Sequence, residues 1–319
     1  MYMEKIKFTL NSNNGEDTLA CFLEIPEEPK GILQICHGMC EYFGRYREFI
    51  DFMLLAGFAV CGHDHVGHGE SARDEEHFGY FGKKDGHKVL ALDAHLVSTY
   101  VKDQLPGLPL FLLGHSMGSF VARDYVSQFG KELDGVIIMG TAGPNPALQA
   151  GLTLAKALRH TKGELHRSKL LNNLAFGGYN KRIKDNRSRF DWLSRDMKTV
   201  VKYTDDKYCS FIFTTRGFED MFTLLGRVND EGWAATVPTD LPVLLVAGDA
   251  DPVGDYGKGV SLVHSWLEKA GVEDLILRLY PEMRHEILNE LGREAVYTDL
   301  LLWLEKRCKL AQRECAGKQ

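Results

Sequence analysis

The sequence predicts an α/β protein with a mostly parallel sheet of eight strands, helices on both faces and an inserted helical cap. Short apolar runs rich in β-branched residues alternate with longer amphipathic stretches along most of the 319 residues, a pattern typical of parallel sheets covered by helices. This alternation stops between Gly143 and Val237, where only helical patterns occur. We therefore expect a core formed by residues 1–143 and 238–319, and a cap formed by residues 144–237.

The eight strands are predicted from alternating or continuous apolar runs. Lys5–Leu10 and Thr18–Ile25 flank a turn-rich segment that contains Asn14-Gly15, which indicates an antiparallel hairpin. The later runs are nearly all apolar, as expected for strands that are covered on both faces. These six strands are predicted at Gly31–Cys36, Phe58–Cys61, Leu110–Leu113, Gly135–Met139, Val243–Ala247 and Leu275–Tyr280.

The helices are predicted from apolar residues that recur at helical spacing. Those of the core are expected at Arg45–Ala56, Val89–Gln104, Met117–Phe129, Tyr256–Ala270 and Leu291–Arg307. Those of the cap are expected at Leu148–Arg159, Ser168–Phe176, Asp196–Tyr203 and Phe218–Val228.

Composition excludes several classes of protein. Hydrophobic residues make up 44% and charged residues 26%, which is ordinary for a globular chain and excludes a disordered one. The net charge of −6 argues against a protein built to hold nucleic acid. No apolar run is long enough to span a membrane or to act as a signal peptide. Seven scattered cysteines without a C-x-x-C pair predict reduced thiols in a cytoplasmic protein.

A G-x-S-x-G motif, Gly114 to Gly118, places Ser116 between the predicted strand Leu110–Leu113 and the predicted helix Met117–Phe129. This context is typical of a nucleophile elbow, which holds a serine hydroxyl above a sheet at a tight strand–helix turn. The alternative interpretation is a serine that only caps the helix, a role that is compatible with catalysis. A serine hydroxyl also needs a base to take its proton.

The acid and the base should follow the serine in that order, each in a loop after a strand. Two carboxylates, Asp249 and Asp251, follow the strand Val243–Ala247, and both are candidates at this point. His285 follows the strand Leu275–Tyr280. Each residue alone has an ordinary explanation as a loop residue, but three suitable residues in the required order predict a Ser–His–Asp site.

At these residues the chain resembles the monoacylglycerol lipase and lysophospholipase branch of the serine α/β-hydrolases, from about residue 18 to 308. The motifs that carry the resemblance are Gly114-His-Ser-Met-Gly118, His37-Gly-Met-Cys-Glu41 with Gly44-Arg-Tyr46, and Gly62-His-Asp-His-Val-Gly-His-Gly-Glu-Ser71.

The resemblance implies the α/β-hydrolase fold and a triad of Ser116, Asp251 and His285, because the family's acid ends a Gly-x-x-Asp segment. It also implies an oxyanion hole formed by the backbone N–H groups of Met39 and Met117. No metal or cofactor is implied, and the substrates implied are monoacylglycerols, lysophospholipids or similar acyl esters.

The chain departs from the family pattern at two positions. Tyr42 stands where the family usually has histidine, and Ser119 stands where it often has a second glycine. Neither position belongs to the implied triad. The cap contains no segment that aligns with the family, so the resemblance says least about the substrate.

Two motifs suggest other functions. Gly67–Ala72 fits a dinucleotide fingerprint, but an acidic, glycine-broken stretch follows where a phosphate-binding helix is needed. His63, His65 and His68 suggest a metal site and hence a metal-dependent hydrolase, which would need further ligands and an open coordination position. His37 and His115 are expected to be packed or hydrogen-bonded histidines rather than bases.

The cap is basic. Residues 144–237 contain 16 lysines and arginines against 10 aspartates and glutamates. The simplest interpretation is a solvated face; the sharper hypothesis is transient contact with anionic lipid or with a negatively charged substrate. Its aromatic residues line an acyl pocket or form the core of the cap itself: Phe176, Trp192, Phe211, Phe213, Phe218, Phe222 and Trp233.

Together these patterns predict a serine carboxylic-ester hydrolase that acts on a small acyl ester through an acyl-enzyme. Serine peptidases and acyltransferases use the same residues, so both remain alternatives. A metal-dependent hydrolase and a non-catalytic binding protein on the same fold are the other classes considered.

Overall fold

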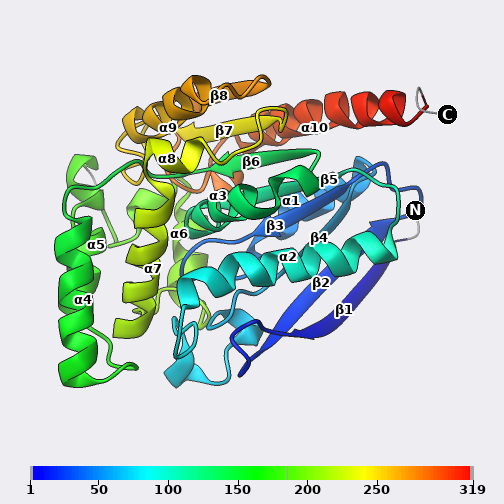
Figure 1. Cartoon of the computed structure of the whole chain (residues 1–319). Coiled ribbons are helices and arrows are strands. Elements are labelled where there is room, and N and C mark those ends of the chain that lie inside the picture. Colours follow the sequence, from blue (N-terminus) through cyan, green and yellow to red (C-terminus); the bar gives the residue numbers. More distant parts are fainter. Residues whose placement is uncertain (1–2, 185, 317–319) are drawn as a thin grey trace.

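The computed structural model describes residues 3–184 and 186–316 and contains one sheet of eight strands over those residues (Figure 1). The strand order is β1-β2-β4-β3-β5-β6-β7-β8. The pairs β1–β2 and β2–β4 are antiparallel, and all the other pairs are parallel. The prediction of a mostly parallel eight-stranded sheet is confirmed.

The strands lie where the sequence predicts them, with ends shifted by a few residues. The N-terminal hairpin joins β1 and β2 around the Asn-Gly turn. Their bounds are β1 Met3–Asn11, β2 Thr18–Pro26, β3 Ile32–Cys36, β4 Ala59–His63, β5 Leu110–His115, β6 Gly135–Met139, β7 Val243–Gly248 and β8 Leu275–Tyr280.

Helices cover both faces of the sheet, and its central strands are therefore buried on both sides. In β5, Leu110 and Leu112 join one apolar cluster, while Phe111 and Leu113 join the other; this is the two-residue alternation of a strand. The first cluster includes side chains of α2 (Gly86–Gln104), α3 (Met117–Phe129) and α9 (Lys258–Lys269). The second includes side chains of α1 (Arg47–Leu55) and α10 (Arg293–Ala316).

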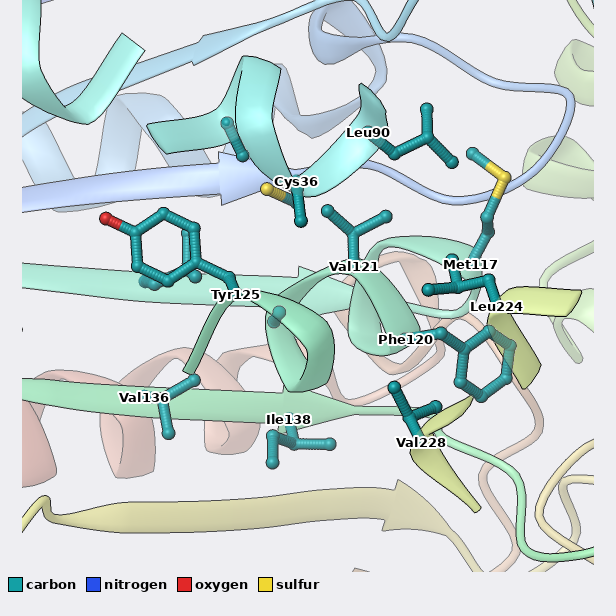
Figure 2. Packing of buried hydrophobic residues seen from close by; sticks show 14 of the residues in the cluster. Cys36, Leu90, Met117, Phe120, Val121, Tyr125, Val136, Ile138, Leu224 and Val228 are labelled. Atoms are coloured by element: carbon teal, nitrogen blue, oxygen red, sulfur yellow. The ribbon is translucent and has the colours of Figure 1, made fainter. Parts of the chain in front are cut away.

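The helix α3 packs tightly on the centre of the sheet. Figure 2 shows Val121 and Tyr125 of this helix in one buried cluster with Cys36 of β3 and Val136 of β6. All four side chains are fully buried. Because α3 begins at the residue after Ser116, this packing holds the serine at a fixed height above the sheet.

The segment between β6 and β7 is helical, as predicted. Figure 1 shows α4, α5 and α7 grouped on the side of the molecule away from both chain ends. Helix α7 begins at Thr215, three residues before the predicted start, because the Thr214 hydroxyl accepts a hydrogen bond from the Gly217 N–H (3.0 Å). The helices of this segment are α4 Leu148–Lys162, α5 Lys169–Phe176, α6 Met197–Asp205, α7 Thr215–Val228 and α8 Glu231–Ala234.

The expectation of cover on both faces is wrong for β8. This strand lies at the edge of the sheet, and among the described residues its one strand partner is β7. Its alternate residue Ile276 is 37% exposed, so the second face of β8 is open to solvent. An apolar run at a sheet edge therefore resembles a buried strand in sequence, although one face of the edge strand is exposed to solvent.

Candidate active site

Ser116 stands at the turn between β5 and α3 with φ 54° and ψ −119°. This backbone conformation is rare for a residue with a side chain and costs about 1–3 kcal/mol. The Ser116 N–H donates to the Met139 carbonyl (3.0 Å), and the Ser116 carbonyl accepts from the Ser119 N–H (2.9 Å). These two bonds hold the strained turn, and the serine is half-buried at the wall of a cavity.

The two glycines of the motif are required by close backbone contacts. A Cβ atom on Gly114 would overlap the Gly118 carbonyl oxygen, and one on Gly118 would overlap the Cys36 carbonyl oxygen. Helix α3 therefore begins in direct contact with the end of β3. The contact brings Ser116 beside the loop that follows β3, where a Cβ on Gly38 would lie only 3.0 Å from the serine Cβ.

Asp251 and His285 meet at the ends of β7 and β8. The His285 Nδ1 atom lies 2.9 Å from Asp251 Oδ2, and both side chains are almost completely buried. The other carboxylate oxygen of Asp251 accepts the Val253 N–H (2.9 Å). In the described part of the chain, His285 Nε2 has no hydrogen-bond partner. With Nδ1–H donated to the carboxylate, Nε2 carries the lone pair that a base needs.

The ring of His285 is fixed from several sides. A Cβ on Gly140, at the end of β6, would lie 3.2 Å from the imidazole Cε1. The Trp192 ring lies 5.1 Å away and the His115 ring 4.8 Å away, measured between ring centroids. His285 and Ser116 line the same cavity, although they come from loops 169 positions apart.

Of the two candidate carboxylates, only Asp251 contacts His285 in the structure. Asp249 instead accepts the Glu282 N–H through Oδ1 (2.6 Å). It thereby ties the β7 loop to the turn after β8, which is the turn role that an aspartate in such a loop commonly has.

Met117 directly follows Ser116 in the chain, and Met39 belongs to the loop after β3. Met117 is the first residue of α3, where backbone N–H groups have no acceptor within the helix. Met39 follows Gly38 and lines the cavity together with Ser116. The loop before Met39 is held by His37, whose Nδ1–H donates to the Gly38 carbonyl (2.8 Å) while its Nε2 accepts the His65 N–H (2.8 Å).

A buried ion cluster that sequence reasoning missed lies behind these residues. Arg45 donates two hydrogen bonds to Glu286 (2.7 and 2.8 Å) and one to Glu41 (2.9 Å). Glu41 also accepts from the Tyr46 hydroxyl (2.8 Å) and pairs with His115 Nδ1 (3.0 Å). Arg45 and Glu41 are four residues apart on the loop and helix after β3, and this spacing was the signal available in the sequence.

The cluster joins the three loops of the site. Glu41 belongs to the loop of Met39 and accepts the Gly38 N–H (2.5 Å), His115 precedes Ser116, and Glu286 follows His285. Burial opposes the charge on His115, but the Glu41 carboxylate outweighs it and raises the pKa of His115. Glu41 and Glu286 therefore share the Arg45 guanidinium, and Glu41 also contacts His115.

Four histidines near the ends of β3 and β4 form a packed group. The rings of His37, His63, His65 and His68 touch one another and are completely buried. Burial lowers the pKa of His63 and of His68 to about 4, and that of His37 to about 3. Among the described residues, no three histidine, cysteine or acidic side chains are arranged to hold a metal ion.

The cavity has a volume of about 980 Å³ and lies between the loops of the site and the helical segment. Five of the seven aromatic residues singled out from the sequence line it, whereas Phe213 and Trp233 are buried elsewhere. Its apolar wall includes Leu148, Leu154, Phe218, Met221, Phe222 and Leu225. Such a wall suits an acyl chain.

A serine on a strained strand–helix turn, a buried His–Asp pair and a shared apolar cavity on this sheet define a serine hydrolase with the α/β-hydrolase fold. The chain belongs to the family described as serine aminopeptidase, S33, whose model matches residues 27–292. The resemblance stated from the motifs is confirmed, as is the prediction of a serine ester hydrolase.

Three relatives illustrate the family. A crystal structure of a thermostable carboxyl esterase from Bacillus coagulans in complex with glycerol is 32% identical and has a TM-score of 0.90, covering 97% of this chain and 99% of that one. Monoglyceride lipase of Homo sapiens is 28% identical over 89% of this chain and 85% of its own length. Phospholipase YtpA of Bacillus subtilis is 26% identical over 85% and 93%. Within the described residues, no helix is long and apolar enough to cross a membrane.

Proposed function

We propose that this serine ester hydrolase cleaves monoacylglycerols or closely related acyl esters through an acyl-enzyme. The observation that carries the proposal is the buried His285–Asp251 pair (2.9 Å), which shares an apolar cavity with the strained Ser116. The cavity can hold a fatty acyl chain, and the relatives named monoglyceride lipase and carboxyl esterase point to the same ester chemistry.

The reaction starts when His285 Nε2 takes the Ser116 hydroxyl proton as Oγ attacks the ester carbonyl carbon. Asp251 holds the Nδ1–H and stabilises the imidazolium that forms. The N–H groups of Met39 and Met117 donate to the oxygen that becomes negative, an interaction that strengthens in the transition state. The C–O bond to the alcohol then breaks, and the leaving alcohol takes the proton from His285. Water then attacks the acyl carbon as His285 takes its proton. His285 gives this proton to Ser116 Oγ as the bond from Oγ to the acyl carbon breaks and the fatty acid leaves.

The test is the release of fatty acid from a monoacylglycerol by wild type and by Ser116→Ala. We expect the variant to lose about 10³-fold or more in kcat with unchanged thermal unfolding. A fluorophosphonate should label wild type and not the variant. Near-normal turnover by Ser116→Ala would refute the mechanism. Faster cleavage of an aminoacyl anilide than of any acyl ester would instead favour the peptidase alternative.

The helical segment also supports a proposed role as a cap, residues 144–237, that touches anionic lipid. Leu170 and Leu174 of α5 are 56% and 63% exposed and lie four residues apart, hence on one face of the helix. Leu174 also lines the cavity. A contact between α5 and a bilayer would therefore bring the cavity next to the membrane that contains a lipid substrate. The basic residues of the segment would strengthen the contact with an anionic bilayer.

The vesicle experiment compares anionic with neutral phospholipid vesicles at low and high salt. We expect binding to the anionic vesicles that weakens as salt rises and that falls in Leu170→Ser/Leu174→Ser. The matched control is Leu302→Ser on α10, whose side chain is 59% exposed outside the cap. The proposal would be contradicted if binding to anionic vesicles changed neither with salt concentration nor with either set of substitutions.

A further inference from the structure

The loop that carries Met39 is attached to the helical segment at two points. The Cys40 thiol donates to the Phe211 carbonyl (3.1 Å), and the Tyr42 hydroxyl donates to Asp206 Oδ2 (2.7 Å). We call the residues that accept these bonds, with those between them, the 206–211 turn. It follows α6 directly, so the helical segment holds the loop on both sides of Glu41.

The 206–211 turn is internally hydrogen-bonded. Asp206 Oδ1 accepts the Tyr208 N–H (2.9 Å), and the Asp206 carbonyl accepts the Cys209 N–H (3.0 Å). One carboxylate therefore folds the turn with one oxygen and holds Tyr42 with the other. The rings of Tyr42 and Tyr208 also meet edge to face, 5.6 Å apart between centroids.

Backbone strain lies on both sides of this contact. Cys40 has φ 56° and Ser210 has φ 59°, and both are residues for which the left-handed region costs about 1 kcal/mol or more. Such conformations persist only where the surroundings over-determine them. The Cys40–Phe211 hydrogen bond joins the two strained segments. Met39, Cys40, Ser210 and Phe211 all line the cavity.

We propose that the 206–211 turn is a positioning device for the Met39 N–H, so that the helical segment sets the geometry of the oxyanion hole. Tyr42 and Asp206 are positioning residues in this account, which rests on the proposed function. Without their bond, the loop can relax at Cys40 and move Met39 away from the place where the oxyanion forms. A displacement of this kind weakens the binding of the transition state more than the binding of the substrate.

The expected result for Tyr42→Phe and for Asp206→Ala is a fall in kcat of about 10-fold, with KM within about 2-fold of wild type. Asp206→Asn keeps an acceptor oxygen and should restore most of the activity. Tyr208→Phe is the matched control, because it removes a hydroxyl from the same turn that bonds to nothing in the described residues. Thermal unfolding of each variant checks that it is folded.

A double variant, Tyr42→Phe with Asp206→Ala, separates coupling from two independent effects. If the two side chains act through one bond, the double variant falls no further than either single one. The inference is overturned if Tyr42→Phe matches Tyr208→Phe, or if its loss appears in KM alone. If wild type shows no hydrolysis that depends on Ser116, the proposed function itself has failed and the positioning role falls with it.

Discussion

His115 Nδ1 lies 3.0 Å from Glu41 Oε1, and 74 sequence positions separate the two residues. Burial disfavours charge on both, but the hydrogen bond between them raises the pKa of His115 and lowers that of Glu41. The residue before Ser116 and a residue of the Met39 loop are therefore hydrogen-bonded to each other inside the protein. This contact links the residue before the nucleophile to the loop of the expected oxyanion hole.

Glu41→Gln should break this pair, because it removes the carboxylate charge while the side-chain volume stays nearly the same. Arg45 and His115 would then share Glu286 alone, and we expect a loss of about 3 kcal/mol in the free energy of unfolding. The pKa of His115 should fall. In wild type, the raised pKa of His115 adds to the free energy of unfolding below the unfolded pKa, and this stabilisation is lost as the pH rises through the folded pKa. The variant should not show this pH-dependent loss of stability.

Urea denaturation and NMR titration of His115 measure both effects. Glu282→Gln is the control, since the Glu282 side chain is 84% exposed and pairs with Arg195 at the surface. An unchanged His115 titration in Glu41→Gln would contradict the coupling between Glu41 and His115.

Acid should destabilise the protein through the buried histidine group at the ends of β3 and β4. The folded pKa of His63, about 4, lies below its ordinary value of 6.5, so the unfolded chain binds the proton first as the pH falls. Stability is therefore lost between pH 6.5 and 4, by at most about 1.4 kcal/mol per pH unit for this residue. His63→Leu should make the decline less steep in urea titrations at successive pH values. An equally steep decline in the variant would show that His63 takes no part.

Asp251→Asn should lower kcat by about 10³-fold or more, because an amide cannot stabilise the imidazolium and favours the wrong tautomer of His285. Asp249→Asn keeps the oxygen that accepts the Glu282 N–H and should change kcat little. Steady-state hydrolysis of one ester by both variants gives the comparison. The reverse order of effects would assign the role of the catalytic acid to Asp249 instead of Asp251.

Gly118→Ala should be among the most damaging small substitutions in the core. The new Cβ would overlap the Cys36 carbonyl oxygen, and neither backbone can move without shifting α3 or β3. We expect a loss of about 3 kcal/mol or more in the free energy of unfolding. Gly226→Ala in α7 is the matched control, because the nearest atom would be a Leu148 methyl at 3.8 Å. That change should stabilise the helix by about 0.5–1 kcal/mol.

The local pattern predicted much of the fold and the main candidates of the site. Strand and helix periodicities located the eight strands. The required order selected Ser116, His285 and either Asp249 or Asp251, and the family resemblance implied Asp251. Of these, the structure brings Asp251 to His285 directly and places Ser116 and His285 in one cavity. Such residues are recognisable in sequence because the elements that present them are formed by nearby residues.

The ion cluster and the 206–211 turn could not be predicted in the same way. Glu41 and Glu286 share Arg45, and Tyr42 reaches Asp206 across 164 positions. No periodicity relates residues so far apart, because their distance depends on how loops pack after the sheet has formed. The exposed edge of β8 was missed for the same reason, since its neighbours and not its own apolar residues decide its burial.

The sequence by itself therefore determined the order of strands and helices, the strained elbow at Ser116 and the types of residue available for catalysis, because these depend on short-range sterics and hydrophobic periodicity. Only the tertiary structure decided which carboxylate meets His285, which carboxylates surround Arg45 and what lines the cavity. Those properties depend on which desolvated groups are brought together, and a buried charge is tolerated only where folding supplies its partner.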